Sequence, residues 1–158
     1  MNCINATSLF LQISNTINDA DTIIALSSSS TNESYLARYL TVFIAGIYEK
    51  SIEEIVWEFA SKSGLPEIEN FVANQVNKTF RNPDMGNIIS LIRQFSSAWA
   101  NQLNQLDDIH KNAINSIITN KNNIAHGDPS LITFSDIKNY HRDASKVIEE
   151  IDRMLLST

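Results

Sequence analysis

Apolar residues recur every three or four positions along most of this chain, which is the spacing that places them on one face of a helix. The pattern predicts helices over about residues 7–26, 33–63, 66–80, 85–103, 108–126 and 136–155. No segment shows the convincing alternation of apolar and polar residues that is typical of a strand. We therefore expect an all-α protein, an antiparallel bundle of about five or six helices with short connections, forming a single domain over residues 1–158.

The predicted second helix is the longest, and we expect it to lie at the centre of the bundle. Its apolar stripe consists of Leu36, Leu40, Phe43, Ile47, Ile55 and Phe59, widened by Tyr39, Ile44, Tyr48 and Val56. Gly64 and Pro66 separate it from the third helix, because glycine suits the position after a helix and proline the first turn of the next one. For the last helix we expect Ser135 to be the N-cap.

The composition agrees with few, long elements. Only 4 glycines and 3 prolines occur among 158 residues, of which 43% are hydrophobic, so turns are scarce and a core can form. The one cysteine, Cys3, permits no disulfide within the chain, which indicates a reducing compartment and a cytoplasmic location. We expect no signal peptide and no membrane span, because the N-terminus lacks the pattern and no apolar run approaches about 18 residues.

The charge is acidic overall but unevenly distributed. A formal net charge of −6 disfavours extensive non-specific binding of nucleic acid. Residues 110–142 nevertheless hold four lysines and arginines against two aspartates, together with all 3 histidines. The acids gather elsewhere, for example at Glu49, Glu53, Glu54, Glu58, Glu67 and Glu69. A local basic site is therefore compatible with the composition.

Residues 120–129 read Asn-Lys-Asn-Asn-Ile-Ala-His-Gly-Asp-Pro and carry the densest set of chemically capable side chains. Asn122 and His126 are four positions apart and share a helix face, and the long Lys121 stem can bring its ammonium toward that side. His126 occupies the last turn, where the negative end of the helix dipole favours the imidazolium form. Gly127 lets the backbone turn, and Asp128 either pairs with His126 or Lys121 or caps the loop.

A cation beside a titratable imidazole suits phosphodiester transfer in RNA. The ribose 2′-hydroxyl attacks the adjacent phosphorus, the imidazole transfers the proton, and the cation stabilises the charge on the phosphorane. No metal or cofactor is expected, because the nucleophile belongs to the substrate and no metal-ligand spacing or phosphate-binding glycine loop is present. One motif supplies one histidine, so a second general catalyst has to come from a second copy in a homodimer.

The residues 121–127 resemble the signature of the HEPN superfamily, in which arginine, often followed by asparagine, precedes a terminal Ala-His-Gly by about one helical turn. The pairs Tyr35-Leu36 and Tyr39-Leu40, followed by Tyr48-Glu49-Lys50, also resemble the RiboL-PSP-HEPN branch. The resemblance implies a helical bundle that dimerises and brings two motifs together in a cleft. It also implies a metal-independent RNase of toxin–antitoxin or other defence systems, with an antitoxin as a further partner.

Carried over by this resemblance, His126 is the general acid/base and Asn122 is a polar helper. Lys121 stands where the family has arginine, and it keeps the charge but loses the planar fork that grips phosphate. The weaker candidates for supporting residues are Glu49, Asn123 and Asp128.

The sequence predicts an RNA endonuclease that leaves a 2′,3′-cyclic phosphate. The alternative is a weakly active or inactive HEPN module that binds RNA, nucleotide or a partner protein. A third interpretation is a helical dimerisation or antitoxin-type protein without a site, in which His126 only caps a helix and Lys121 is a solvated surface residue.

Overall fold

The computed structural model describes residues 1–27 and 29–157, and over these residues it consists of seven helices and no strands. The helices are α1 (Ile4–Ser27), α2 (Ser30–Ser61), α3 (Pro66–Thr79), α4 (Met85–Arg93), α5 (Ser97–Asn104), α6 (Asp108–His126) and α7 (Phe134–Leu156). The predicted all-α fold class is confirmed. None of the helices in the described part of the chain is long and apolar enough to cross a membrane.

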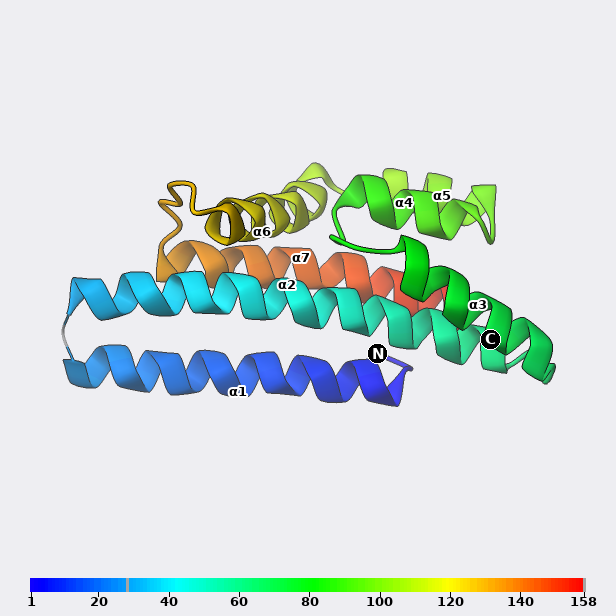
Figure 1. Ribbon diagram of the computed structural model, residues 1–158, viewed down its shortest axis with the longest axis horizontal. Helices are drawn as coiled ribbons and strands as arrows, with labels where there is room; N and C mark the ends of the chain where they lie inside the picture. The colour runs from blue at the N-terminus through cyan, green and yellow to red at the C-terminus, as the bar shows by residue number, and fades with distance from the viewer. Residues whose placement is uncertain (28, 158) are drawn as a thin grey trace.

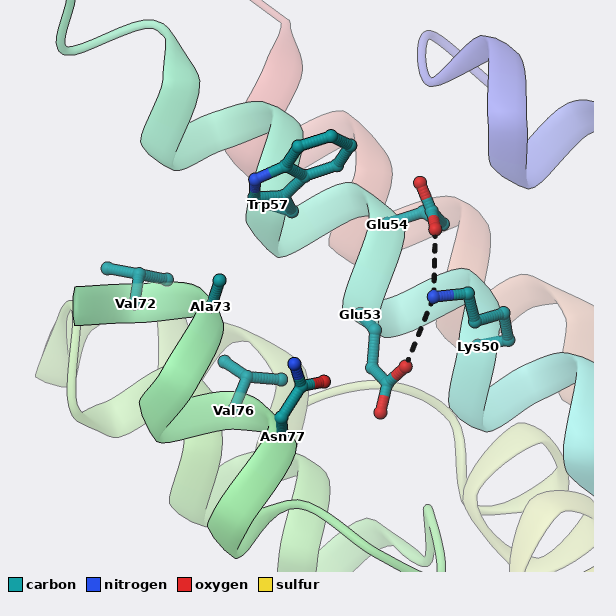
Figure 2. A pocket seen from close by; sticks show the side chains of 8 residues that line it. All are labelled: Lys50, Glu53, Glu54, Trp57, Val72, Ala73, Val76 and Asn77. Atoms are coloured by element: carbon teal, nitrogen blue, oxygen red, sulfur yellow. Dashed lines mark ion pairs between the residues drawn. The ribbon is translucent and has the colours of Figure 1, made fainter. Parts of the chain in front are cut away.

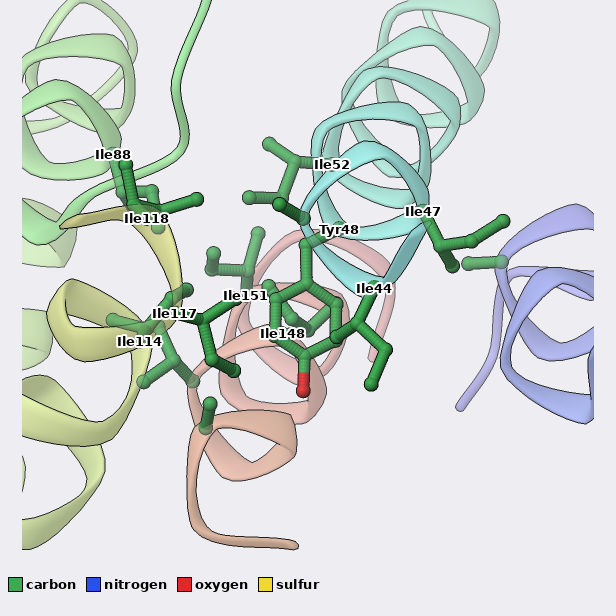
Figure 3. Close-up of a cluster of buried hydrophobic side chains, with 14 of the residues drawn as sticks. Ile44, Ile47, Tyr48, Ile52, Ile88, Ile114, Ile117, Ile118, Ile148 and Ile151 are labelled. Atoms are coloured by element: carbon green, nitrogen blue, oxygen red, sulfur yellow. The ribbon is translucent and has the colours of Figure 1, made fainter. Parts of the chain in front are cut away.

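The central position predicted for the longest helix is confirmed. α2 packs against α1, α3, α6 and α7, and its inward face includes Ile44, Tyr48, Ile52 and Ile55, all inaccessible to solvent. Figure 3 shows Ile44, Tyr48 and Ile52 of α2 beside side chains of α6 and α7, which include Ile117 and Ile148. Most of the stripe that the sequence predicts therefore lies in the core. Leu36, Phe43 and Phe59 are partly buried against it, and Tyr39 remains 54% exposed.

Two hairpins of antiparallel helices, α1–α2 and α6–α7, lie against each other (Figure 1). Across the join, α2 and α7 run in the same direction. Tyr48 contacts His141 near the middle of both helices, and Lys62 Nζ donates to the Leu156 carbonyl at 3.0 Å near their ends. The antiparallel arrangement therefore holds within each hairpin and not between α2 and α7.

Two predicted boundaries are wrong, and local side-chain caps explain both. The predicted helix over residues 85–103 is two helices, because Ser96 accepts a hydrogen bond from the Trp99 N–H and starts a new helix. The N-cap of α7 is Thr133 and not Ser135. Thr133 Oγ1 accepts from the Asp136 N–H, and the Asp136 carboxylate accepts from the Thr133 N–H, which together form a capping box.

Candidate functional site at the end of α6

The C-terminal end of α6 is closed by a turn at Gly127, which has a φ of 78°. The Gly127 N–H donates to the Ile124 carbonyl at 3.3 Å, and the Asp128 N–H donates to the Asn123 carbonyl at 2.8 Å. This pair of bonds is the Schellman motif, and the left-handed backbone it needs is easiest for glycine. Asp128 is exposed, and the bond that it contributes to this turn comes from its backbone N–H.

His126 lies on a polar ridge that runs along the outer face of α6. Asn115, Thr119, Asn122 and His126 follow one another at spacings of four, three and four residues, so they share one face of the helix. Asn122 is half-buried and His126 is exposed at the end of the ridge. The imidazole is therefore open to a ligand or to another protein surface. Asn123 is half-buried on a different face and contributes its carbonyl to the helix cap.

Lys121 does not extend into solvent. Its side chain is half-buried, and Nζ donates to Oδ1 of Asn82 and, at 3.0 Å, to Oδ1 of Asn122. The second bond brings the ammonium toward the face that carries Asn122, as the length of the lysine stem suggests. Both partners are neutral amide oxygens, so the positive charge of Lys121 is oriented by them without being neutralised.

Asn82 belongs to the turn between α3 and α4 and has a φ of 52°, a left-handed conformation that asparagine tolerates better than most residues. Its backbone N–H donates to Oε2 of Glu49 at 2.9 Å, and its carbonyl accepts from Nδ2 of Asn87 at 2.9 Å. Next in the turn, the Met85 N–H donates to Oδ1 of Asn115 at 2.9 Å. The turn is therefore held by α2 on one side and by α6 on the other.

Glu49 is connected to the site only indirectly. Its carboxylate reaches Lys121 through Asn82, and no direct ion pair between Glu49 and Lys121 occurs in residues 1–27 and 29–157. Sequence analysis did not identify Asn82 or Asn115 as residues of the site. The available signal was the Asn82-Pro83 dipeptide, which marks a turn but says nothing of the helix on which the turn rests.

No group of three His, Cys, Asp or Glu side chains in the part of the chain that the structure describes is arranged to hold a metal ion. The chemistry offered at the end of α6 is that of one ammonium, one imidazole and several amides. Amides and an ammonium donate hydrogen bonds to phosphate oxygens, and an imidazole moves a proton near neutral pH.

A helical bundle with a Lys-Asn pair and an Ala-His-Gly at the end of its penultimate helix has the features of a HEPN-type protein. The family model described as RiboL-PSP-HEPN matches residues 2–157, and the chain therefore belongs to this family. No curated protein and no solved structure gives a significant match to the chain.

Proposed function

We propose that this protein is a metal-independent RNA endonuclease whose active site contains His126, Lys121 and Asn122. The observation that carries the proposal is the exposed His126 at the end of α6, the helix that also carries, five residues earlier, the oriented and un-neutralised ammonium of Lys121. Membership of a HEPN family supports it, because HEPN domains are often nucleases.

In the proposed reaction the 2′-oxygen of ribose forms a bond to the adjacent phosphorus while the bond from phosphorus to the 5′-oxygen breaks. A general base takes the 2′-hydroxyl proton, and a general acid gives a proton to the departing 5′-oxygen. Lys121 and the Asn122 amide stabilise the additional negative charge on the phosphorane. The products are a 2′,3′-cyclic phosphate and a 5′-hydroxyl.

The reaction needs two proton-transfer groups, and each chain contributes one histidine at this place. We propose that a homodimer brings His126 and the partner subunit's His126 to opposite sides of one phosphodiester. The exposure of His126 at the end of α6 supports this arrangement, because a buried imidazole could not reach a second subunit. A role as a cytoplasmic toxin or defence nuclease, with an antitoxin as partner, belongs to the same proposal.

A second candidate function is RNA binding with little or no cleavage. Lysine in place of the family's arginine favours it, because an ammonium lacks the bidentate geometry that a guanidinium offers to a phosphate. In that case Lys121 and the ridge asparagines would still bind the RNA backbone.

Cleavage of RNA in EDTA by the wild type and by His126→Ala tests the proposal. We expect the variant to cleave more slowly by about a hundredfold or more, because general acid–base catalysis contributes at least that much. His110→Ala, at the opposite end of α6, is the matched control and should cleave like the wild type. Products ending in a 5′-phosphate, or equal cleavage by wild type and His126→Ala, contradict the nuclease. Binding without cleavage by a folded wild type supports the second candidate.

A further inference from the structure

α3 is the least covered helix of the bundle. It packs chiefly against α2, and of its 14 residues only Val76 is fully buried. Ile68, Phe71, Val72 and Val76 follow one another at helical spacing and form its apolar face. This face is half open, since Phe71 is 69% and Ile68 44% exposed. Trp57 on α2 is 45% exposed as well. An amphipathic helix with its apolar face in water is typical of a surface that binds another protein.

A pocket of about 200 Å³ opens between α2 and α3 beside this face. Figure 2 shows Val72, Ala73, Val76 and Asn77 on α3 facing the α2 side chains Lys50, Glu53, Glu54 and Trp57. Two further depressions flank α3. Leu91 and Phe95 help to line one of them, and Phe59 and Ile68 help to line the other. Val72 lines all three, so they form a set of adjoining apolar sites around one residue.

The polar wall of the pocket contains two carboxylates that bind cations of this chain, and Nη1 of Arg81 lies 3.6 Å from Oε1 of Glu53. The Glu53 and Glu54 side chains are only 15% and 14% exposed, and Lys50 Nζ lies 3.5 Å from Oε2 of Glu53 and 2.9 Å from Oε1 of Glu54. Burial opposes ionisation of Glu54, but hydrogen bonds from Lys50 and Asn5 hold its pKa below the usual range. The Lys50 and Arg81 side chains are 54% and 57% exposed, so a cation of a partner protein has to replace them at the two carboxylates.

The charge around this surface favours some binding partners over others. Residues 49–81, which include all of α3 and the Arg81 that pairs with Glu53, contain six glutamates against Lys50, Lys62, Lys78 and Arg81, a net of −2. RNA is repelled by such a field. A second copy bound through the same face would set two surfaces of equal negative charge against each other, because the contact in a twofold dimer is self-complementary. A positively charged protein segment is the complementary partner.

We propose that this face, formed by Trp57, Glu53, Glu54, Ile68, Phe71 and Val72, binds a basic amphipathic helix of a partner protein. The partner's apolar side chains fill the depressions around Val72. One arginine or lysine of the partner enters the pocket, where it contacts the two carboxylates and the Trp57 indole. This inference is independent of RNA cleavage, because none of these residues belongs to the end of α6.

The test uses a labelled synthetic amphipathic helix of leucine, alanine and arginine as the probe, titrated with the full chain and followed by fluorescence anisotropy. We expect Phe71→Ser and the double variant Glu53→Gln/Glu54→Gln each to raise the dissociation constant by about tenfold or more. In a Trp99→Phe background, which leaves Trp57 as the single indole, binding should change the tryptophan emission.

Two control variants make the same changes in polarity and charge at positions outside this face. Leu131→Ser alters a side chain that is 92% exposed outside this face, and Asp19→Asn/Glu33→Gln removes the same number of acids near the other end of α2. Both should bind the probe like the wild type. The proposal is overturned if the probe does not bind, if the controls weaken binding as much as Phe71→Ser, or if an otherwise identical peptide with glutamate in place of arginine binds equally well. Because Phe71 is exposed, the Phe71→Ser chain should remain folded, which circular dichroism verifies.

Discussion

Lys121 owes its position to two asparagine side chains. Asn122 is its neighbour in the helix, whereas Asn82 comes from a turn 39 residues earlier and is itself held by Glu49. A flexible lysine loses more side-chain entropy than arginine's planar group on forming each bond to phosphate, so a pre-oriented ammonium makes a better electrostatic catalyst than a free one. Asn82 is therefore a positioning residue for the proposed reaction.

Asn82→Gly removes the side chain that contacts Lys121 while the backbone of the turn stays as it is. Glycine adopts the left-handed conformation freely and retains the N–H bonded to Glu49, so only the amide that accepts from Lys121 is lost. We expect RNA cleavage to slow by about tenfold, while the free energy of unfolding changes by no more than about 1 kcal/mol. Asn82→Asp retains an acceptor but places a carboxylate against Lys121, so it should not recover the rate, because the ammonium is then neutralised. Equal cleavage by wild type and Asn82→Gly in a chain that cuts RNA would show that the lysine needs no positioning.

At the scale of elements, the joint between the two helical hairpins contains a buried polar contact. Tyr48 Oη on α2 lies 2.8 Å from Nδ1 of His141 on α7, and the Phe10 ring of α1 stacks on Tyr48 at 5.6 Å. Burial lowers the pKa of His141 to about 4, although Glu149 acts in the opposite direction. Three helices therefore meet around an imidazole that stays neutral at physiological pH.

This contact predicts a loss of stability in mild acid. Above pH 6.5 the imidazole is neutral in both the folded and the unfolded chain. As the pH falls toward 4 only the unfolded chain takes up the proton, so the contribution decreases by about 2 to 3 kcal/mol at pH 4.5. Urea unfolding at pH 7 and pH 4.5 measures this change in the free energy of unfolding. His141→Gln, which cannot titrate, should lose less stability than the wild type between these two values. The same loss in both chains would place the pH dependence in other groups.

At the scale of the whole molecule, the N-terminus is fastened to the last helix. The first turn of α1 contains no acidic residue of its own. Asp152 of α7, which is 2% exposed, accepts hydrogen bonds from the backbone N–H groups of Asn2 and Cys3, the latter at 2.8 Å. A carboxylate at a helix N-terminus satisfies free N–H groups and complements the helix dipole. The Asp152 side chain thus links the first helix of the bundle to the last.

Replacing Asp152 by alanine leaves those N–H groups without an acceptor, one of them in a buried setting. We expect the free energy of unfolding to fall by about 2 to 4 kcal/mol, and by less in Asp152→Asn, which retains one acceptor oxygen. Asp107→Ala is the matched control, because Asp107 is the N-cap of α6 but its side chain makes no capping bond. Urea unfolding at neutral pH compares the three variants. A loss in Asp107→Ala as large as that in Asp152→Ala would contradict the assignment.

The apolar periodicity of this chain predicts most of its helices and the central place of α2. The spacing of four residues predicts that Asn122 and His126 share a helix face. These properties depend on residues within a turn or two of one another, and such local patterns are visible in a sequence. The misplaced boundaries at Ser96 and Thr133 were local as well, but they depended on which of several serines and threonines formed the cap.

Only the tertiary structure decided which distant groups meet. Asn82 reaches Lys121, and Asp152 reaches the start of α1, because a particular packing of α2, α6 and α7 brings them together. The helical spacing of apolar residues places Phe71 on the apolar face of α3, but it does not show that this face stays largely uncovered by the residues that the structure describes. The spacing of apolar residues is a property of one helix, whereas burial and long-range hydrogen bonds depend on the neighbours that the fold provides.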